Sequence, residues 1–99
     1  MSLLVRYTLA SPEDHDTQIS ALKALVDDLR AEGIAGLHYS CFATEDPTRF
    51  IGLLEFPDDT VKQKFLESAA FAAYRRTGAE IFANPPEPTP ITAIASTRD

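Results

Sequence analysis

Few side chains in this sequence titrate near neutral pH, where a general base is most useful. The chain has two histidines: His38 lies in a largely apolar stretch, and His15 lies in a polar one where we expect it to be solvated. A neutral imidazole titrates near pH 7, so His38 is the better candidate for a general base. Tyr7 and Tyr39 could position an oxygen atom of a bound molecule, because tyrosine carries a polar hydroxyl on an apolar ring. Alternatively, His38 lies on an edge strand or at a subunit interface, and the tyrosines are core or rim residues.

Aromatic residues farther along the chain could form the apolar wall of a pocket. Phe65, Phe71 and Tyr74 lie in a segment that also contains several closely spaced alanines. Small side chains leave space between a helix and a sheet, or they let the two pack closely with no space between them. The sequence leaves both possibilities open.

Two arginines could hold an acidic group of a bound molecule. Arg6 and Arg75 could each bind a carboxylate or a phenolate, because the guanidinium group is permanently charged and donates several hydrogen bonds. In the structural alternative, Arg6 pairs with Glu55 or with a charge across an interface. Arg75 would then form a solvated helix face with Arg76.

Composition excludes several other kinds of site. With one cysteine, Cys41, and two distant histidines, the chain has no metal-ligand spacing, and it lacks a glycine-rich phosphate loop, so we expect no metal and no cofactor. A net charge of -6 argues against binding to nucleic acid or to an anionic membrane. No apolar run reaches the roughly 18 residues of a membrane span, and signal-peptide features are lacking. We therefore expect a cytoplasmic protein.

The hydrophobic pattern predicts alternating strands and helices. Alternating side chains over 3–9 and 36–43 predict two strands, residues 50–56 predict a third that is apolar on both faces, and a weaker strand is predicted over 91–95. Helical spacing from Ile19 to Leu29 predicts a first helix that ends at Gly33. A second helix begins near residue 60, breaks at Ser68, and continues from 69 to about 82, where several prolines follow.

This β-α-β-β-α-β order predicts one ferredoxin-like domain over residues 1–99. Each helix joins two parallel strands that leave room for a third between them. The result is one antiparallel four-stranded sheet with both helices on one face.

The third predicted strand indicates a homodimer. Phe50, Leu54 and Phe56 lie on one of its faces, whereas Ile51 and Leu53 lie on the other. Helices cover only one face of such a sheet, so either choice leaves large apolar side chains in water at about 1.5–3 kcal/mol each. A second copy that packs sheet against sheet would remove this cost. Cover by a loop and the C-terminal tail is the alternative.

The sequence resembles the antibiotic biosynthesis monooxygenase superfamily of dimeric α/β barrels in three features. These are the order of its elements, the third strand that is apolar on both faces, and the segment 65–74 with the proline-rich stretch that follows it. The resemblance covers residues 3 to about 95. Its members include cofactor-independent oxygenases, haem-degrading enzymes and proteins of unknown function. Haem-degrading relatives typically use an asparagine on the first strand, a tryptophan, and a histidine on the second helix. Quinol-oxidising relatives commonly carry that histidine too. This sequence has no asparagine on its first predicted strand, no tryptophan, and no histidine in its second predicted helix.

These observations together predict a homodimer that binds a small aromatic molecule between its sheet and second helix. The resemblance implies oxidation of a phenolic or quinol-type substrate by molecular oxygen without a prosthetic group. His38 would be the base, and Tyr7 and Tyr39 would position the substrate. A non-catalytic binding or interaction dimer and a non-oxidative enzyme such as an isomerase remain alternatives, and the face on which His38 lies discriminates among them. The expected substrate contacts are Phe65, Phe71, Tyr74 and Arg6.

Overall fold

The computed structural model describes residues 1–98 and contains the predicted four-stranded sheet. Its strands are β1 (Ser2–Thr8), β2 (His38–Ala43), β3 (Arg49–Glu55) and β4 (Glu87–Ile91). They lie in the order β2-β3-β1-β4, and every neighbouring pair is antiparallel. This order confirms the ferredoxin-like arrangement expected from the sequence.

The helices begin and end where the local sequence provides caps. A short 3-10 turn, η1 (Pro12–Asp14), precedes α1 (His15–Glu32), which ends at Gly33 in the left-handed conformation with φ of 63°. Asp58 caps α2 (Asp59–Leu66), and Ser68 caps α3 (Ala69–Ile81) by accepting a hydrogen bond from the Phe71 amide. Ser68 thus divides the second helical segment into two helices, as predicted.

Strand β4 occupies a different part of the chain from the one predicted. We expected it over 91–95, but it runs over Glu87–Ile91 and includes Pro88 and Pro90. These prolines lie two residues apart, so both direct their nitrogens to the same side of the strand. In the sheet that residues 1–98 form, β4 lies at the edge beside β1, and an edge strand tolerates proline because its outward side forms no sheet hydrogen bonds.

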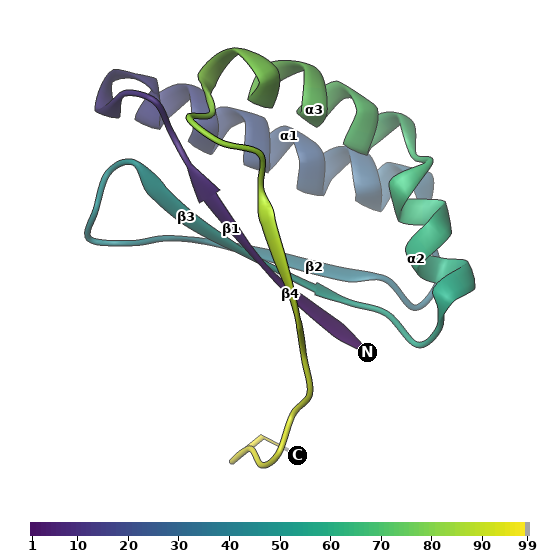
Figure 1. Cartoon of the computed structure of the whole chain (residues 1–99). Coiled ribbons are helices and arrows are strands. Elements are labelled where there is room, and N and C mark those ends of the chain that lie inside the picture. Colours follow the sequence, from purple (N-terminus) through teal and green to yellow (C-terminus); the bar gives the residue numbers. More distant parts are fainter. Residues whose placement is uncertain (99) are drawn as a thin grey trace.

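Helices α1 and α3 cover one face of the sheet, and no helix among residues 1–98 covers the other (Figure 1). Register places Tyr7 opposite Phe50 and Leu3 opposite Leu54 on the helix-covered face, which we call the inner face. Apolar side chains from this face and from α1, α2 and α3 form the core. Along β3, residues 50, 52 and 54 are buried, whereas 51 and 53 are only partly buried on the outer face.

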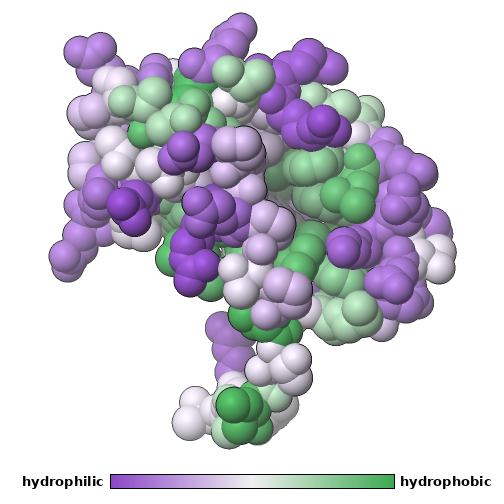
Figure 2. All heavy atoms as spheres, viewed as in Figure 1, coloured by the Kyte–Doolittle hydropathy of each residue, from purple (hydrophilic) through white to green (hydrophobic). Residues whose placement is uncertain are grey.

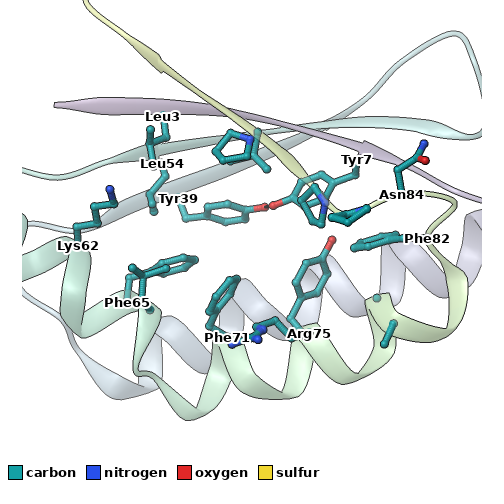
Figure 3. Close-up of a pocket in the computed structure, with 18 of the residues that line it drawn as sticks. Leu3, Tyr7, Tyr39, Leu54, Lys62, Phe65, Phe71, Arg75, Phe82 and Asn84 are labelled. Atoms are coloured by element: carbon teal, nitrogen blue, oxygen red, sulfur yellow. Dashed lines mark hydrogen bonds between the residues drawn. The ribbon is translucent and has the colours of Figure 1, made fainter.

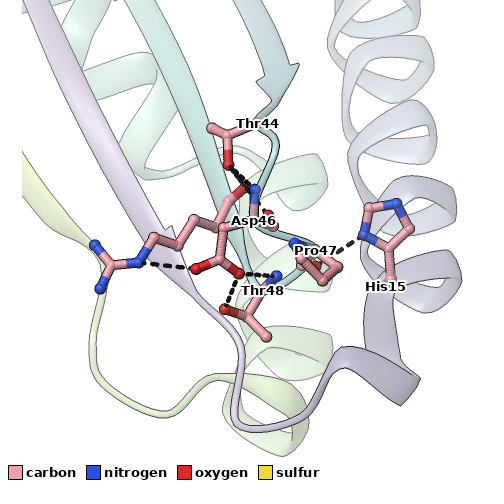
Figure 4. A network of polar contacts seen from close by, with 6 residues as sticks. His15, Thr44, Asp46, Pro47 and Thr48 are labelled. Atoms are coloured by element: carbon pink, nitrogen blue, oxygen red, sulfur yellow. Dashed lines mark hydrogen bonds and ion pairs between the residues drawn. The ribbon is translucent and has the colours of Figure 1, made fainter.

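The turn between β2 and β3 is tied to the start of α1 (Figure 4). Nδ1 of His15 lies 2.8 Å from the Pro47 carbonyl oxygen, and its ring lies 5.2 Å from the ring of Phe50. His15 is therefore partly buried at a helix start, and the expectation that it is merely solvated was wrong. Within the turn, Asp46 accepts hydrogen bonds from the backbone and the hydroxyl of Thr48, and these bonds lower the pKa of its carboxyl.

None of the helices described for residues 1–98 combines the length and the apolar character needed to cross a bilayer.

Candidate ligand-binding site

A cavity of about 840 Å³ lies between the inner face of the sheet, helices α2 and α3, and the proline-rich segment that leads into β4. Figure 2 shows apolar side chains gathered in the hollow between β4 and α2, with hydrophilic side chains around it. This volume is within the range of pockets that hold small organic ligands. We call it the tyrosine cavity, because Tyr7, Tyr39 and Tyr74 all line it.

Two tyrosine hydroxyls meet at the sheet side of the cavity (Figure 3). The oxygen atoms of Tyr7 and Tyr39 lie 2.8 Å apart and share a hydrogen bond. Gly52, on the strand between them, makes this approach possible. A Cβ atom at Gly52 would lie 2.7 Å from the Tyr39 hydroxyl and 3.1 Å from the Tyr7 hydroxyl. The tyrosine pair thus lies where any side chain larger than glycine at this position would stand.

A third hydroxyl reaches the cavity from α3. Tyr74 meets the ring of Tyr7 edge-on, with 5.8 Å between ring centroids, and its hydroxyl accepts a 2.8 Å hydrogen bond from Nε2 of Gln18. Gln18 lies on α1 and is fully buried. Its Oε1 atom has no hydrogen-bond partner among the described residues.

All three tyrosines remain neutral phenols at physiological pH. Burial is the largest cause and raises the pKa of Tyr7, Tyr39 and Tyr74. At Tyr7 the hydrogen bond with Tyr39 acts in the opposite direction and lowers the pKa. Burial also raises the pKa of the Cys41 thiol, and a raised pKa keeps the thiol protonated. The cavity therefore offers hydroxyl donors and no tyrosinate or thiolate base.

The residues predicted to form an aromatic wall do line the cavity. Phe65 of α2 and Phe71 of α3 lie with ring centroids 4.6 Å apart, and Tyr39 stacks on Phe65 at 6.2 Å. Tyr74 lies farther along α3 on the same wall. The structure therefore brings together five of the seven predicted site residues: Tyr7, Tyr39, Phe65, Phe71 and Tyr74.

The other two predicted site residues, His38 and Arg6, lie elsewhere. His38 is opposite Glu55 and Arg6 is opposite Ile51, so both belong to the outer face of the sheet. His38 is exposed and borders a separate, smaller cavity of about 280 Å³ beside the end of α1. Arg6 contacts Thr89 of β4 at 3.3 Å. Since neighbouring strand residues point to opposite faces, this placement does not support His38 as base or Arg6 as substrate contact in the tyrosine cavity.

The charged side chains lining the tyrosine cavity are both cations. Lys62 comes from α2 and Arg75 from α3, and the Arg75 guanidinium lies 5.7 Å from the centre of the Phe71 ring. Among residues 1–98, no aspartate, glutamate or histidine lines this cavity. Nor do the described residues contain a cluster of side chains that could hold a metal ion.

Sequence reasoning missed parts of the site. Gln18 follows the same helical stripe as Leu22, Leu25 and Leu29, so a polar residue on an apolar stripe was the available signal. Asn84, Pro85 and Pro86 also line the cavity, whereas the sequence indicated only that they end a helix.

Comparisons with known proteins support the fold. No family model matches the sequence, and no curated protein matches it. A crystal structure described as an antibiotic biosynthesis monooxygenase aligns with 96% of this chain and 100% of its own, at 16% identity and a TM-score of 0.78. A protein from Caulobacter crescentus, named as a candidate for the same class, aligns over 95% and 89% at 11% identity and a TM-score of 0.82.

A third similar structure has no assigned activity. It is a protein of unknown function from Nitrosomonas europaea, aligned over 96% of this chain and 89% of its own at 20% identity and a TM-score of 0.79. The chain therefore has the fold of the antibiotic biosynthesis monooxygenases, which confirms at the level of fold the resemblance stated from the sequence. Such low identities show the fold alone, so the activity must be argued from the cavity.

Proposed function

We propose that the protein binds a small phenolic or quinol-type aromatic molecule in the tyrosine cavity and oxidises it with molecular oxygen without a prosthetic group. The observation that carries the proposal is the contact between the Tyr7 and Tyr39 hydroxyls in an aromatic cavity that Tyr74 also lines. The wall would cover the apolar ring of the substrate, and the hydroxyls would hold its oxygen.

The chemistry balances with the substrate as the only reductant. A phenol with a free para position and one molecule of oxygen give a para-quinone and one molecule of water. The substrate supplies all the electrons, one oxygen atom enters the ring carbon, and the other leaves as water. The contribution of the protein would be to orient the ring and to exclude water from the reacting carbon.

Oxygen consumption tests this proposal directly. Metal-stripped protein would be incubated with a panel of phenols and hydroquinones, and wild type would be compared with Tyr39→Phe and His38→Ala. We expect uptake above the spontaneous rate, loss of most of it in Tyr39→Phe, and an unchanged rate in His38→Ala. With a phenol as substrate, one atom of isotopically labelled oxygen should appear in the quinone product. Uptake that depends on His38 would contradict the assignment of the reaction to this cavity.

The second candidate function is non-catalytic binding of the same class of molecule. The absence of an aspartate, glutamate or histidine from the residues lining the described cavity favours it, because deprotonation of a phenol ordinarily needs a base. Saturable binding of phenols with no oxygen uptake across the panel would establish this candidate and reject the oxygenase.

We further propose that two copies of the chain associate through the outer face of the sheet. Leu4, Ile51 and Leu53 are only partly buried there, and Phe42 is 52% exposed. Register places Leu53 beside Leu4, and Ile51 beside Phe42, so these side chains form one continuous apolar patch. Burial of this patch against a second copy would stabilise both protomers by about 25 cal/mol for each Å² of apolar surface removed from water.

A further inference from the structure

We infer that the tyrosine cavity takes its ligand as an oxyanion: an apolar ring system whose ionised oxygen is held by hydrogen-bond donors, with Gln18 as a positioning residue behind them. This inference deepens the proposed function by naming the ionisation state that the site selects. It applies equally whether the ligand is then oxidised or only bound.

The first step of the argument counts hydroxyl protons. Tyr7 and Tyr39 share one hydrogen bond between two hydroxyl groups, so one of their two protons stays free whichever group donates. Tyr74 accepts a hydrogen bond from Gln18, so its own proton is left for the Tyr7 hydroxyl or for a ligand oxygen. Three hydroxyl protons with at most two hydrogen bonds among the three groups leave at least one free donor for a ligand oxygen, and burial keeps that donor protonated by raising the pKa of each tyrosine.

The orphaned oxygen of Gln18 supports its positioning role. Gln18 is fully buried, and its Oε1 atom has no hydrogen-bond partner among residues 1–98. A buried amide with one unpaired end is costly, and an apolar residue of similar size would avoid that cost. If the side-chain amide of Gln18 were turned by 180°, its oxygen would face the Tyr74 hydroxyl and both of its N–H protons would be unpaired. Buried unpaired donors are rarer than buried unpaired acceptors. What Gln18 provides is therefore the hydrogen bond that fixes the direction of the Tyr74 hydroxyl.

The charges around the cavity favour the same ligand. The protein as a whole carries a net charge of -6, yet the charged residues lining the described cavity, Lys62 and Arg75, are both cations. Lysine and arginine only donate hydrogen bonds, and they attract an anion. A carboxylate or a phenolate on an aromatic ring satisfies these donors, whereas a neutral ether or a bare hydrocarbon does not.

An oxyanion site would also replace the missing base. When donors and cations bind an ionised phenol more tightly than its neutral form, the pKa of the bound phenol falls, and the proton leaves to solvent. The substrate would then be present as the electron-rich phenolate without any proton acceptor in the cavity.

The test uses pairs of probes that differ only in ionisable oxygen. The binding of 4-nitrophenol, whose two forms absorb at different wavelengths, would be compared across pH with the binding of its methyl ether, 4-nitroanisole. A second arm compares 4-nitrobenzoate with its methyl ester, which separates phenolate from carboxylate ligands. We expect the phenolate to bind at least about tenfold more tightly than neutral phenol, seen as a bound pKa about one unit below that of the free probe.

Matched variants separate this site from general electrostatics. Arg75→Met and Lys62→Met should each reduce the preference for the anion, whereas Arg76→Met and Lys64→Met, exposed cations on the same helices that do not line the cavity, should leave it unchanged. Gln18→Met should also reduce it without loss of thermal stability. Because Arg75 is exposed, its variant keeps the test decisive even if the Gln18 variant fails to fold.

The outcomes distinguish this inference from the proposed function. Equal affinity for 4-nitrophenolate and 4-nitroanisole, no binding of any probe, or the same effect from all four cation variants would overturn the inference. A preference for the anion with no oxygen uptake would support the inference and reject the oxygenase. Oxygen uptake with no preference for the anion would support the oxygenase and reject the inference.

Discussion

The two faces of the sheet are built from the same strands but differ in what covers them. His38 and Tyr39 are consecutive residues, yet Tyr39 lies in the aromatic cavity under the helices while His38 is exposed on the opposite face. Gly52 and Leu53 show the same contrast, one beneath the tyrosine pair and one in the apolar outer patch. The inner face thus lines a cavity, and the outer face leaves apolar side chains partly exposed.

The proposed ligand binding and the proposed self-association therefore use opposite faces of one sheet. A substitution on the outer face should change association and leave the cavity intact, and a substitution on the inner face should do the reverse. The predictions below test that separation, beginning with the largest expected effect.

The largest effect is expected from a charge in the outer apolar patch. Leu53→Glu should weaken self-association at least about 100-fold, or about 2.7 kcal/mol, because the carboxylate would be buried without a partner. Sedimentation equilibrium measures this change, with Arg76→Glu on the exposed side of α3 as the control. A wild-type protein that is monomeric at high concentration would reject the proposed interface.

A smaller but more local effect is expected on the inner face. Gly52→Ala places a Cβ atom within 2.7 Å of the Tyr39 hydroxyl, so that hydroxyl must move and the Tyr7–Tyr39 hydrogen bond is lost. We expect destabilisation by about 1–3 kcal/mol, measured by denaturant unfolding, with unchanged self-association.

A second substitution checks the cause of that loss. Tyr39→Phe removes the oxygen atom that the new Cβ would meet, so the double variant should recover part of the stability lost by Gly52→Ala. Additive losses in the double variant would show that the glycine is needed for another reason.

The tyrosine cluster predicts a dependence of stability on high pH. The folded-state pKa of each tyrosine is raised by burial, so the stability it contributes is full below the unfolded-state pKa of about 10 and is lost as pH rises beyond it. The chain has three tyrosines and no tryptophan, so the absorbance of tyrosinate reports on this cluster alone. Ionisation should coincide with the loss of helical circular dichroism. Tyrosinate that forms near pH 10 in a folded protein would contradict the described burial.

The smallest effect is expected at His38. Because its side chain is exposed and borders neither the tyrosine cavity nor the core, His38→Ala should change the free energy of unfolding by less than about 0.5 kcal/mol. Phenol binding, measured by calorimetry, should also be unchanged. Tyr39→Phe, one residue away, is the matched comparison and should weaken binding.

The sequence was sufficient to predict the fold and most of the cavity wall, but it could not decide which face of each strand the helices cover. In β3, Phe50 and Ile51 are both apolar, so alternation did not distinguish inside from outside, and His38 could not be separated from Tyr39. Only the packing of α1 and α3 makes that choice. The position of β4 was also missed, because Pro88 and Pro90 argue locally against a strand and only its place at the sheet edge permits one.

The prolines of β4 have one more consequence. A sheet edge with free N–H groups is a template on which further chains can add, and continued addition of this kind leads to aggregates. Pro88 and Pro90 have no N–H group, so β4 is a poorer template for an added strand than an edge strand without proline. Growth by strand addition is therefore expected first at β2, the opposite edge of the same sheet.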